Sequence, residues 1–228
     1  MSRACTVIAT ALFVVGAARA SPFWVTWDDG WPEDQGWTHW SSGPPAQRWL
    51  EDGVLFVDTR SEFGIRDQYY QNPATLIPGS GETFVLEWRV CVDESTPISD
   101  PGVLVRAEDN YSVNFTMDTH SIHSNYEPGK WAPFAPNEFH EFLLESTDMR
   151  AYDLYIDGAL ALQGTFFESL FPGPFVDWGN FGGCKTMTAW DQVAYGIVPE
   201  PTALVCLLLP LLFGQSLIRS TTQNSRNL

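Results

Sequence analysis

Apolar side chains recur at every second position in several short stretches between residues 21 and 198, which is the pattern of β-strands. The longest stretch runs from Phe84 to Val92, where apolar residues alternate with mostly polar ones. Residues 111–117 and 152–156 repeat this alternation. Because each stretch has one apolar and one polar side, we predict strands that bury one face and expose the other.

Turn sequences separate these stretches at intervals of about 8–15 residues. They occupy residues 42–45, 51–53, 78–81, 100–102, 127–129, 157–158, 171–174 and 182–183. Asp157-Gly158 joins two alternating stretches directly, and both residues accept positive φ, so we predict a tight β-hairpin there. Many short strands at this spacing predict an all-β sandwich or jelly roll.

The first twenty residues have a different pattern. Arg3 precedes an apolar run, and Ala18 and Ala20 place small residues at the −3 and −1 positions of a cut before Ser21. This is the pattern of a secretory signal peptide, which is removed from the mature protein. We therefore predict that the domain between residues 21 and 197 is exported.

A second apolar run, about residues 202–218, lies near the C-terminus and is followed by Arg219. Its length is just sufficient for a transmembrane helix, which needs roughly 17–25 residues. The positive charge that follows favours the cytoplasmic side, so the domain before the helix would face outward. An ordinary C-terminal membrane anchor would have the same hydropathy.

The tail from residue 198 to residue 228 resembles the PEP-CTERM sorting signal. The resemblance rests on Pro199, Glu200 and Pro201 directly before the apolar run, and on Arg219 after it. The basic cluster is thinner than is typical, because Arg226 is the only other basic residue in the tail. The resemblance implies an exosortase-type sorting enzyme as a partner, with cleavage near the Pro-Glu-Pro motif.

The domain resembles the concanavalin A-like, laminin-G-like sandwiches over roughly residues 22–197. Three phrases carry the resemblance: "RWLEDGVLFVDT", "YDLYIDGALALQGTF" and "VDWGNFGG…TAWDQVAYG". It implies a concanavalin A-like jelly-roll β-sandwich. That fold supports lectins, glucanases and adhesion modules alike, so the fold does not decide the function.

The net charge of the domain limits which classes of ligand it can bind. The chain carries a formal charge of −16, and residues 21–198 hold 8 of its basic and 27 of its acidic side chains. Such a surface repels nucleic acid and anionic lipid headgroups. It is compatible with divalent cations and with neutral ligands such as sugars, and it also simply increases solubility.

The sequence gives only weak indications of a catalytic site. Glucanases of this fold share an E-x-D-x-x-E strand motif, and no such phrase occurs in this chain. Glu138, Glu141 and Glu145 form the nearest carboxylate cluster, which we interpret as a solvated face. His120 and His123 have no third ligand nearby in sequence, so we expect them at the surface or in a turn rather than at a zinc site.

Five tryptophans crowd a stretch of 17 residues near the start of the domain: Trp24, Trp27, Trp31, Trp37 and Trp40. Exposed indole rings stack on sugar rings, so this group is a candidate carbohydrate-binding site. The alternative is that the rings fill the space between the sheets. We expect Trp88 and Trp190 to do so, because both lie in alternating strands.

Two further features concern metal and redox chemistry. Asp28 and Asp29 would meet Asp191 if the first and last strands pair, which would start a structural calcium site that needs several more oxygen ligands. Cys91 and Cys184 are the cysteines of the exported domain, and an oxidising exterior would permit a disulfide between them.

Together these patterns predict an exported protein of the cell surface or extracellular matrix, tethered by its C-terminal helix. We expect a non-catalytic carbohydrate-binding or structural module, with an extracellular polysaccharide as a partner. The alternative is a glycan-cleaving hydrolase of the concanavalin A-like glucanase type, which would need two carboxylates facing each other in a cleft.

Overall fold

The computed structural model describes residues 23–199, except residues 29, 44–45, 61–64, 96–100, 172 and 183–184. The predicted signal peptide, with Ala18, Ala20 and Ser21, lies outside the described residues, as do Glu200, Pro201, Arg219 and the predicted helix at 202–218. Within the described part, no helix has the length and hydropathy required to cross a bilayer. The predictions for both ends of the chain therefore stay predictions.

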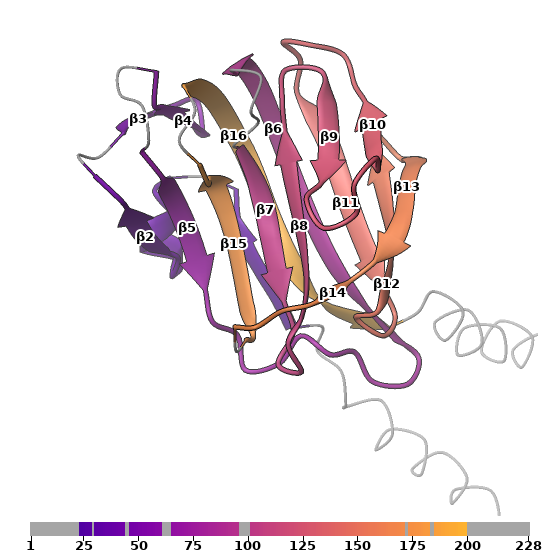
Figure 1. Ribbon diagram of the computed structural model, residues 1–228. Coiled ribbons are helices and arrows are strands. Elements are labelled where there is room, and N and C mark those ends of the chain that lie inside the picture. The colour runs from indigo at the N-terminus through magenta and orange to yellow at the C-terminus, as the bar shows by residue number, and fades with distance from the viewer. Residues whose placement is uncertain are drawn as a thin grey trace, which may run out of the picture. The chain divides into compact units, whose positions relative to one another are not determined.

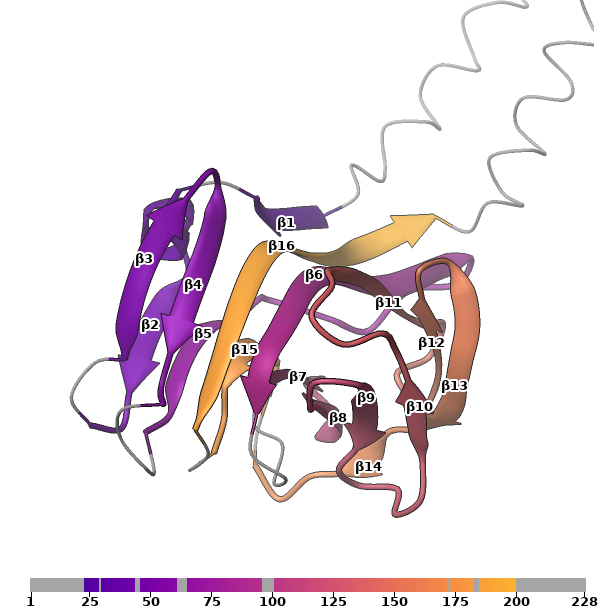
Figure 2. The ribbon, with the colours of Figure 1, turned by 90° about the horizontal axis from the view of Figure 1, so that it is seen from above.

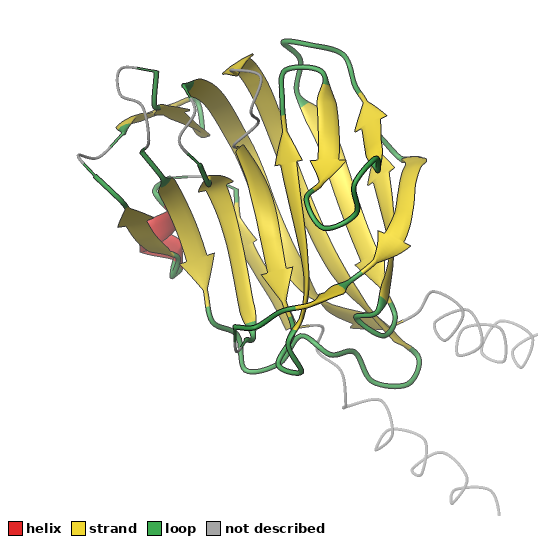
Figure 3. Ribbon diagram, viewed as in Figure 1, coloured by secondary structure: helices red, strands yellow, loops and turns green. Residues whose placement is uncertain are grey.

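The described residues form sixteen β-strands and one short 3₁₀ helix (Figure 3). The helix η1 spans Pro32–Gln35. The strands are β1 Phe23–Trp27, β2 Thr38–Ser41, β3 Gln47–Glu51, β4 Val54–Asp58, β5 Asp67–Gln71, β6 Glu82–Ser95, β7 Pro101–Arg106, β8 Tyr111–Met117, β9 Ser121–Ser124, β10 Trp131–Pro133, β11 His140–Ser146, β12 Ala151–Ile156, β13 Ala159–Thr165, β14 Phe167–Glu168, β15 Phe175–Asn180 and β16 Thr186–Pro199.

The strands form two sheets that lie face to face (Figures 1 and 2). Sheet A has the order β13-β12-β11-β6-β16-β4-β3, with β1 beside β16. Sheet B has the order β10-β9-β8-β7-β15-β5-β2, with β14 beside β8. The strand pairs with a defined register are antiparallel, for example β11 with β6 and β15 with β7. The prediction of an all-β sandwich is confirmed.

The predicted strands lie where the alternation placed them. In β6, the side chains of Phe84, Leu86, Trp88 and Val90 are buried, whereas those between them, apart from Val85, are more exposed. The stretches at 111–117 and 152–156 are β8 and β12. The predicted hairpin also forms, since Asp157 and Gly158 have φ values of 51° and 76° and join β12 to β13.

An aromatic cluster around Trp178 occupies the space between the sheets. The ring of Trp178, from β15 of sheet B, stacks on Trp27 at 5.0 Å and on Tyr69 at 4.7 Å between ring centroids. Trp190, from β16 of sheet A, lies 5.0 Å away, and Trp37 packs edge-on at 5.7 Å. Since the members come from both sheets, the cluster joins the two layers.

We expect Trp178→Ala to lower the free energy of unfolding by about 3–5 kcal/mol, because it leaves a cavity where both sheets meet. Chemical denaturation monitored by circular dichroism would measure the change. Trp40→Ala is the control, since Trp40 is 44% exposed and its loss leaves no buried cavity. Equal stability of the two variants would contradict this account of the core.

Candidate functional site

The outer face of sheet B carries an open, shallow pocket of about 430 Å³ near its β2 edge, which we call the sheet B pocket. Three strands that are neighbours in the sheet, β2, β5 and β15, supply most of its lining. The lining residues are Trp40, Arg66, Gln68, Tyr70, Phe175 and Asp177. The pocket therefore combines three aromatic rings with an amide, a guanidinium and a carboxyl group.

Strand register brings these side chains together. Trp40 in β2 lies opposite Gln68 in β5, and Tyr70 in β5 lies opposite Asp177 in β15. Side chains at alternate positions point to the same face of a sheet, so Phe175 joins Asp177 on the outer face. The rings of Phe175 and Tyr70 stack with their centroids 5.5 Å apart.

Asp177 is the unusual group in the pocket. It is 6% exposed, and its Oδ1 atom has no hydrogen-bond partner among the described residues. Burial raises the pKa of this carboxyl well above its ordinary value, although the backbone N–H of Trp178 and the charge of Arg106 act in the opposite direction. A carboxyl with a raised pKa remains neutral to a higher pH and can donate as well as accept a hydrogen bond.

Arg106, on β7, lies beside the sheet B pocket. Its guanidinium lies over the rings of Phe175 and Phe171, 5.5 Å and 5.4 Å from their centroids. Burial lowers the pKa of Arg106, while Tyr126 and Asp177 act to raise it. The guanidinium remains charged near neutral pH, so a cation and aromatic surface lie beside the pocket.

The structure separates the five tryptophans that the sequence groups together. Trp27 and Trp37 fill the core at 0% and 2% exposure, so the carbohydrate-binding prediction is wrong for these two, because a ligand cannot reach them. Trp31 is half-buried beneath Arg48, whose guanidinium carbon is 5.4 Å from its ring centre. Trp40 lines the sheet B pocket. The side chain of Trp24 lies outside the described residues.

The predicted calcium site stays untested. β1 does pair with β16, as the prediction required. However, Asp191 forms an ion pair with Arg89, Asp28 is exposed at the end of β1, and Asp29 lies outside the described residues. Among the described residues, no group of three or more acidic, histidine or cysteine side chains is arranged to hold a metal ion.

The predicted disulfide is likewise untested, because Cys184 lies outside the described residues. Cys91 forms no disulfide with a described residue and is half-buried in β6. Burial, and then the charge of Asp93, raise the pKa of the Cys91 thiol. The thiol is therefore poorly activated as a nucleophile.

Of the carboxylates singled out in the sequence, Glu138 lines a second pocket, described below, together with Asp157. Glu141 and Glu145 alternate with buried residues in β11 and face outward from sheet A, as predicted for a solvated face. Glu138 is exposed in the preceding loop. In the sheet B pocket, Asp177 is the only acidic residue among the described lining.

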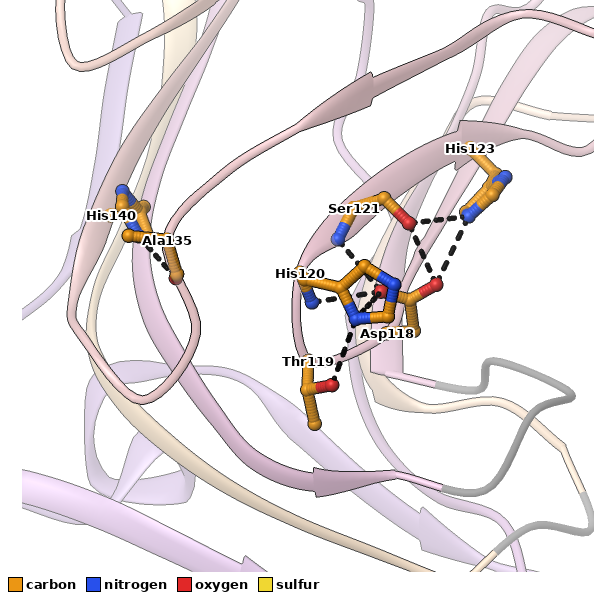
Figure 4. Close-up of polar contacts among 7 residues, drawn as sticks. All are labelled: Asp118, Thr119, His120, Ser121, His123, Ala135 and His140. Atoms are coloured by element: carbon orange, nitrogen blue, oxygen red, sulfur yellow. Dashed lines mark hydrogen bonds and ion pairs between the residues drawn. The ribbon is translucent and has the colours of Figure 1, made fainter.

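A second polar cluster lies at the turn between β8 and β9 (Figure 4). Asp118 accepts hydrogen bonds from the backbone N–H groups of His120 and Ser121 and from the Ser121 hydroxyl. The Nε2 atom of His123 is 2.8 Å from the Ser121 hydroxyl and 3.2 Å from the Asp118 carboxylate. A catalytic histidine needs the serine and the acid on opposite ring nitrogens, so this cluster is built to hold the turn.

A second pocket, of about 540 Å³, lies between β10 and the β12–β13 hairpin. Its lining is mainly alanine, proline and other apolar side chains, with two carboxylates, Glu138 and Asp157. Asp157 is engaged, since it accepts a hydrogen bond from the backbone N–H of Glu141 at 3.0 Å. Both ring nitrogens of His140 are already engaged, with Asp157 at 2.7 Å and with the carbonyl oxygen of Ala135 at 2.8 Å. Its histidine therefore has no ring nitrogen left for a ligand, and we take the sheet B pocket as the candidate site.

Sequence reasoning identified Trp40 but missed the other residues of the sheet B pocket. Tyr70 and Gln68 belong to the short segment "DQYYQ", which gives no strong alternation. Asp177 lies between the apolar residues Val176 and Trp178, so the sequence indicates only the polar position of an ordinary strand. The available signal was the aromatic residue that directly follows Gln68 and Asp177, and it does not reveal which strands are neighbours.

No protein-family model matches the chain, and no curated protein is significantly similar to it in sequence. Solved structures with a similar fold include a conserved carbohydrate esterase from the Shiga toxin-encoding bacteriophage phi24B, with a TM-score of 0.52 and 11% identity over 75% of this chain and 94% of that one. Peanut lectin has a TM-score of 0.51 and 8% identity, over 78% of this chain and 98% of that one.

A protein of unknown function from Shewanella oneidensis MR-1 is similar at a TM-score of 0.50 and 11% identity, over 78% of this chain and 87% of that one. At these identities the likeness shows the fold alone. The likeness to these structures supports the β-sandwich predicted from the sequence.

The raised pKa of Asp177 predicts a distinctive effect on stability. An unfolded aspartate has a pKa of about 3.9. Because the folded-state pKa is higher, ionisation of Asp177 costs folding free energy as the pH rises from about 4 through the folded-state pKa. Asp177→Asn removes this cost, so we expect the variant to gain about 1–3 kcal/mol relative to the original protein at pH 8 and little at pH 4.

The measurement is denaturant unfolding at several pH values. Asp118→Asn is the matched control with the opposite sign: burial acts to raise the pKa of Asp118, but hydrogen bonds from Ser121, His120 and His123 lower it overall. Removing that carboxylate should therefore destabilise the protein at neutral pH, and less so in acid. A pH-independent effect of Asp177→Asn would show that the carboxyl is not perturbed.

Proposed function

We propose that this chain is an exported protein of the cell surface or extracellular matrix, and that its sandwich binds carbohydrate without cleaving it. The observation that carries the proposal is the sheet B pocket, where Trp40, Tyr70 and Phe175 surround Gln68 and Asp177. Aromatic faces stack on the CH faces of sugar rings, and the polar groups between them can bind hydroxyls. This combination is what a sugar site requires.

The fold is consistent with that proposal but does not carry it. One similar structure is described as a carbohydrate esterase and another as a lectin, and these descriptions apply to those proteins. Sandwiches of one fold can have unrelated functions, so function must be argued from the site. Here the site is the group of aromatic rings that line the pocket on the outer face of sheet B.

The number of carboxyl groups in the sheet B pocket favours binding of a sugar over its hydrolysis. Most glycosidases use two carboxyl groups, about 5–5.5 Å apart in retaining enzymes and about 6.5–9.5 Å apart in inverting ones. The described lining of the sheet B pocket contains Asp177 alone. One carboxyl group cannot act as both nucleophile and acid in the usual mechanism, so the sheet B pocket does not support the hydrolase alternative. The second pocket has two carboxylates, Glu138 and Asp157, but Asp157 is already held by His140 and by the backbone N–H of Glu141.

Export and tethering are proposed from the ends of the sequence. The signal-like residues 1–20, the Pro199-Glu200-Pro201 motif and the apolar run that follows support secretion, membrane retention and recognition by an exosortase-type enzyme. The C-terminus would be cytoplasmic before processing. The domain would then lie where extracellular polysaccharide is available.

We expect Trp40→Ala to weaken sugar binding at least about tenfold, because it removes an exposed ring that lines the sheet B pocket. The measurement is a glycan array followed by calorimetric titration, using the full chain purified in a mild detergent. Trp131→Ala is the matched control, since Trp131 is 55% exposed at the opposite edge of the same sheet. Unchanged binding by the Trp40 variant, or no binding of any sugar by the original protein, would contradict the proposal.

Intact-mass measurement of the protein recovered from its natural cells tests the processing. We expect an N-terminus at Ser21 and a C-terminus near the Pro199–Pro201 motif. Ala20→Phe should block the first cut, because signal peptidase sites require a small residue there, and should leave the second unaffected. Recovery of the unprocessed 228-residue chain from the cytosol would refute export.

A further inference from the structure

Arginine side chains divide into two groups in the described part of the chain. Four of the six described arginines form ion pairs with carboxylates. These pairs are Arg48 with Glu33, Arg60 with Asp58, Arg89 with Asp191 and Arg150 with Asp109. Two arginines lie at or beside the sheet B pocket: Arg66 in its lining, and Arg106 over the ring of Phe175, where the charge of Asp177 also acts on it.

Arg66 offers its guanidinium to solvent. It is exposed, and its side chain makes no ion pair with another described residue. Its backbone is held in place, because the Arg66 N–H donates to the Ser42 hydroxyl and the Arg66 carbonyl accepts from the Ser42 N–H. The neighbouring Asp67 is fully buried and binds His39 at 3.0 Å, so it does not neutralise Arg66. A positioned cation is therefore available at the pocket.

The acid of the same pocket does not neutralise Arg66 either. The Oδ1 atom of Asp177 has no hydrogen-bond partner among the described residues, and the side chain is almost wholly buried. Burial raises the pKa of Asp177, which favours the neutral acid. The pocket thus presents an accessible guanidinium, a buried carboxyl that can donate, and the amide of Gln68.

We propose that the sheet B pocket selects an acidic sugar, a pyranose that carries a carboxylate, and that Arg66 is the residue that binds this carboxylate. The inference rests on the proposed carbohydrate-binding function and names its ligand class. The planar guanidinium fork matches a carboxylate with two parallel hydrogen bonds. The aromatic rings take the sugar ring, and Gln68 and Asp177 bind its remaining oxygens.

The formal charge of −16 does not forbid an anionic ligand. At physiological ionic strength the screening length is about 8 Å, so distant surface carboxylates are largely screened while contacts within the pocket are not. The raised pKa of Asp177 favours its neutral form, which reduces its repulsion of an anionic ligand. The side chains beside Asp177 are Tyr70, opposite it on β5, and Arg106 on β7, and neither is a carboxylate.

The test compares each acidic sugar with its own neutral form. Oligogalacturonate, oligoglucuronate and oligomannuronate of equal length are titrated into the full chain in mild detergent, each beside its carboxyl-reduced counterpart, in which CH₂OH replaces the carboxylate. At least one acidic oligomer should bind on the order of tenfold to a hundredfold more tightly than its neutral counterpart, as expected for hydrogen bonds to a charged group.

Arg66→Gln should abolish this preference, because it weakens binding of the acidic oligomer far more than binding of its neutral counterpart. Arg66→Lys should restore part of the preference, because lysine keeps the charge and loses the paired geometry. Arg89→Gln is the matched control, since it removes the same charge but Arg89 is half-buried on sheet A and already paired with Asp191. We expect it to bind every oligomer as the original protein does. Thermal unfolding confirms that each variant is folded.

The outcomes separate this inference from the proposed function. Equal binding of acidic and neutral oligomers, or a preference that survives Arg66→Gln, would overturn the inference and leave a carbohydrate-binding function standing. Failure of these oligomers and of every sugar on the glycan array would overturn both. A preference lost equally in the Arg66 and Arg89 variants would show only a general effect of net charge, which also overturns the inference.

Discussion

The packing of Trp178 between the two sheets is the constraint on which the rest of the structure depends. Its ring contacts Trp27 and Trp190 from sheet A and Tyr69 from sheet B, so it fixes how β15 lies against the opposite layer. Side chains alternate along a strand, so burying Trp178 directs Asp177 to the outer face. A shift of β15 by one residue would place a carboxyl in the core and an indole outside.

The same register explains why Asp177 is buried although it points outward. Tyr70 lies opposite it on β5, Phe175 shares its strand face, and Arg106 lies next to Phe175 on β7. These large side chains surround the short carboxyl group and exclude water from it. Desolvation without a hydrogen-bond partner at Oδ1 then favours the neutral form. The chemistry of the pocket thus follows from how the core is packed.

The fold was largely predictable, whereas the candidate site was not. Alternation in β6, β8 and β12 reports directly on burial, because the strand period is two and one face of each strand meets the core. The Trp cluster gave less guidance: Trp37 and Trp40 are close in sequence and equally apolar, yet one lies in the core and the other lines the pocket. Because the two residues are three positions apart, their side chains point to opposite faces of sheet B, and one of those faces is buried against sheet A.

The sequence by itself determined that residues 84–92, 111–117 and 152–156 form strands, where the β12–β13 hairpin turns, and that the chain carries a large excess of acid, since each follows from local pattern or from counting. Only the tertiary structure decided that Trp40, Arg66, Tyr70 and Asp177 share one pocket, because β2, β5 and β15 are neighbours in the sheet although far apart in the chain. The tertiary structure also decides whether a charged side chain has an ion-pair partner. Arg66 and Arg89 look alike in sequence, and only the fold gives Arg89 a carboxylate partner and leaves the guanidinium of Arg66 open to a ligand.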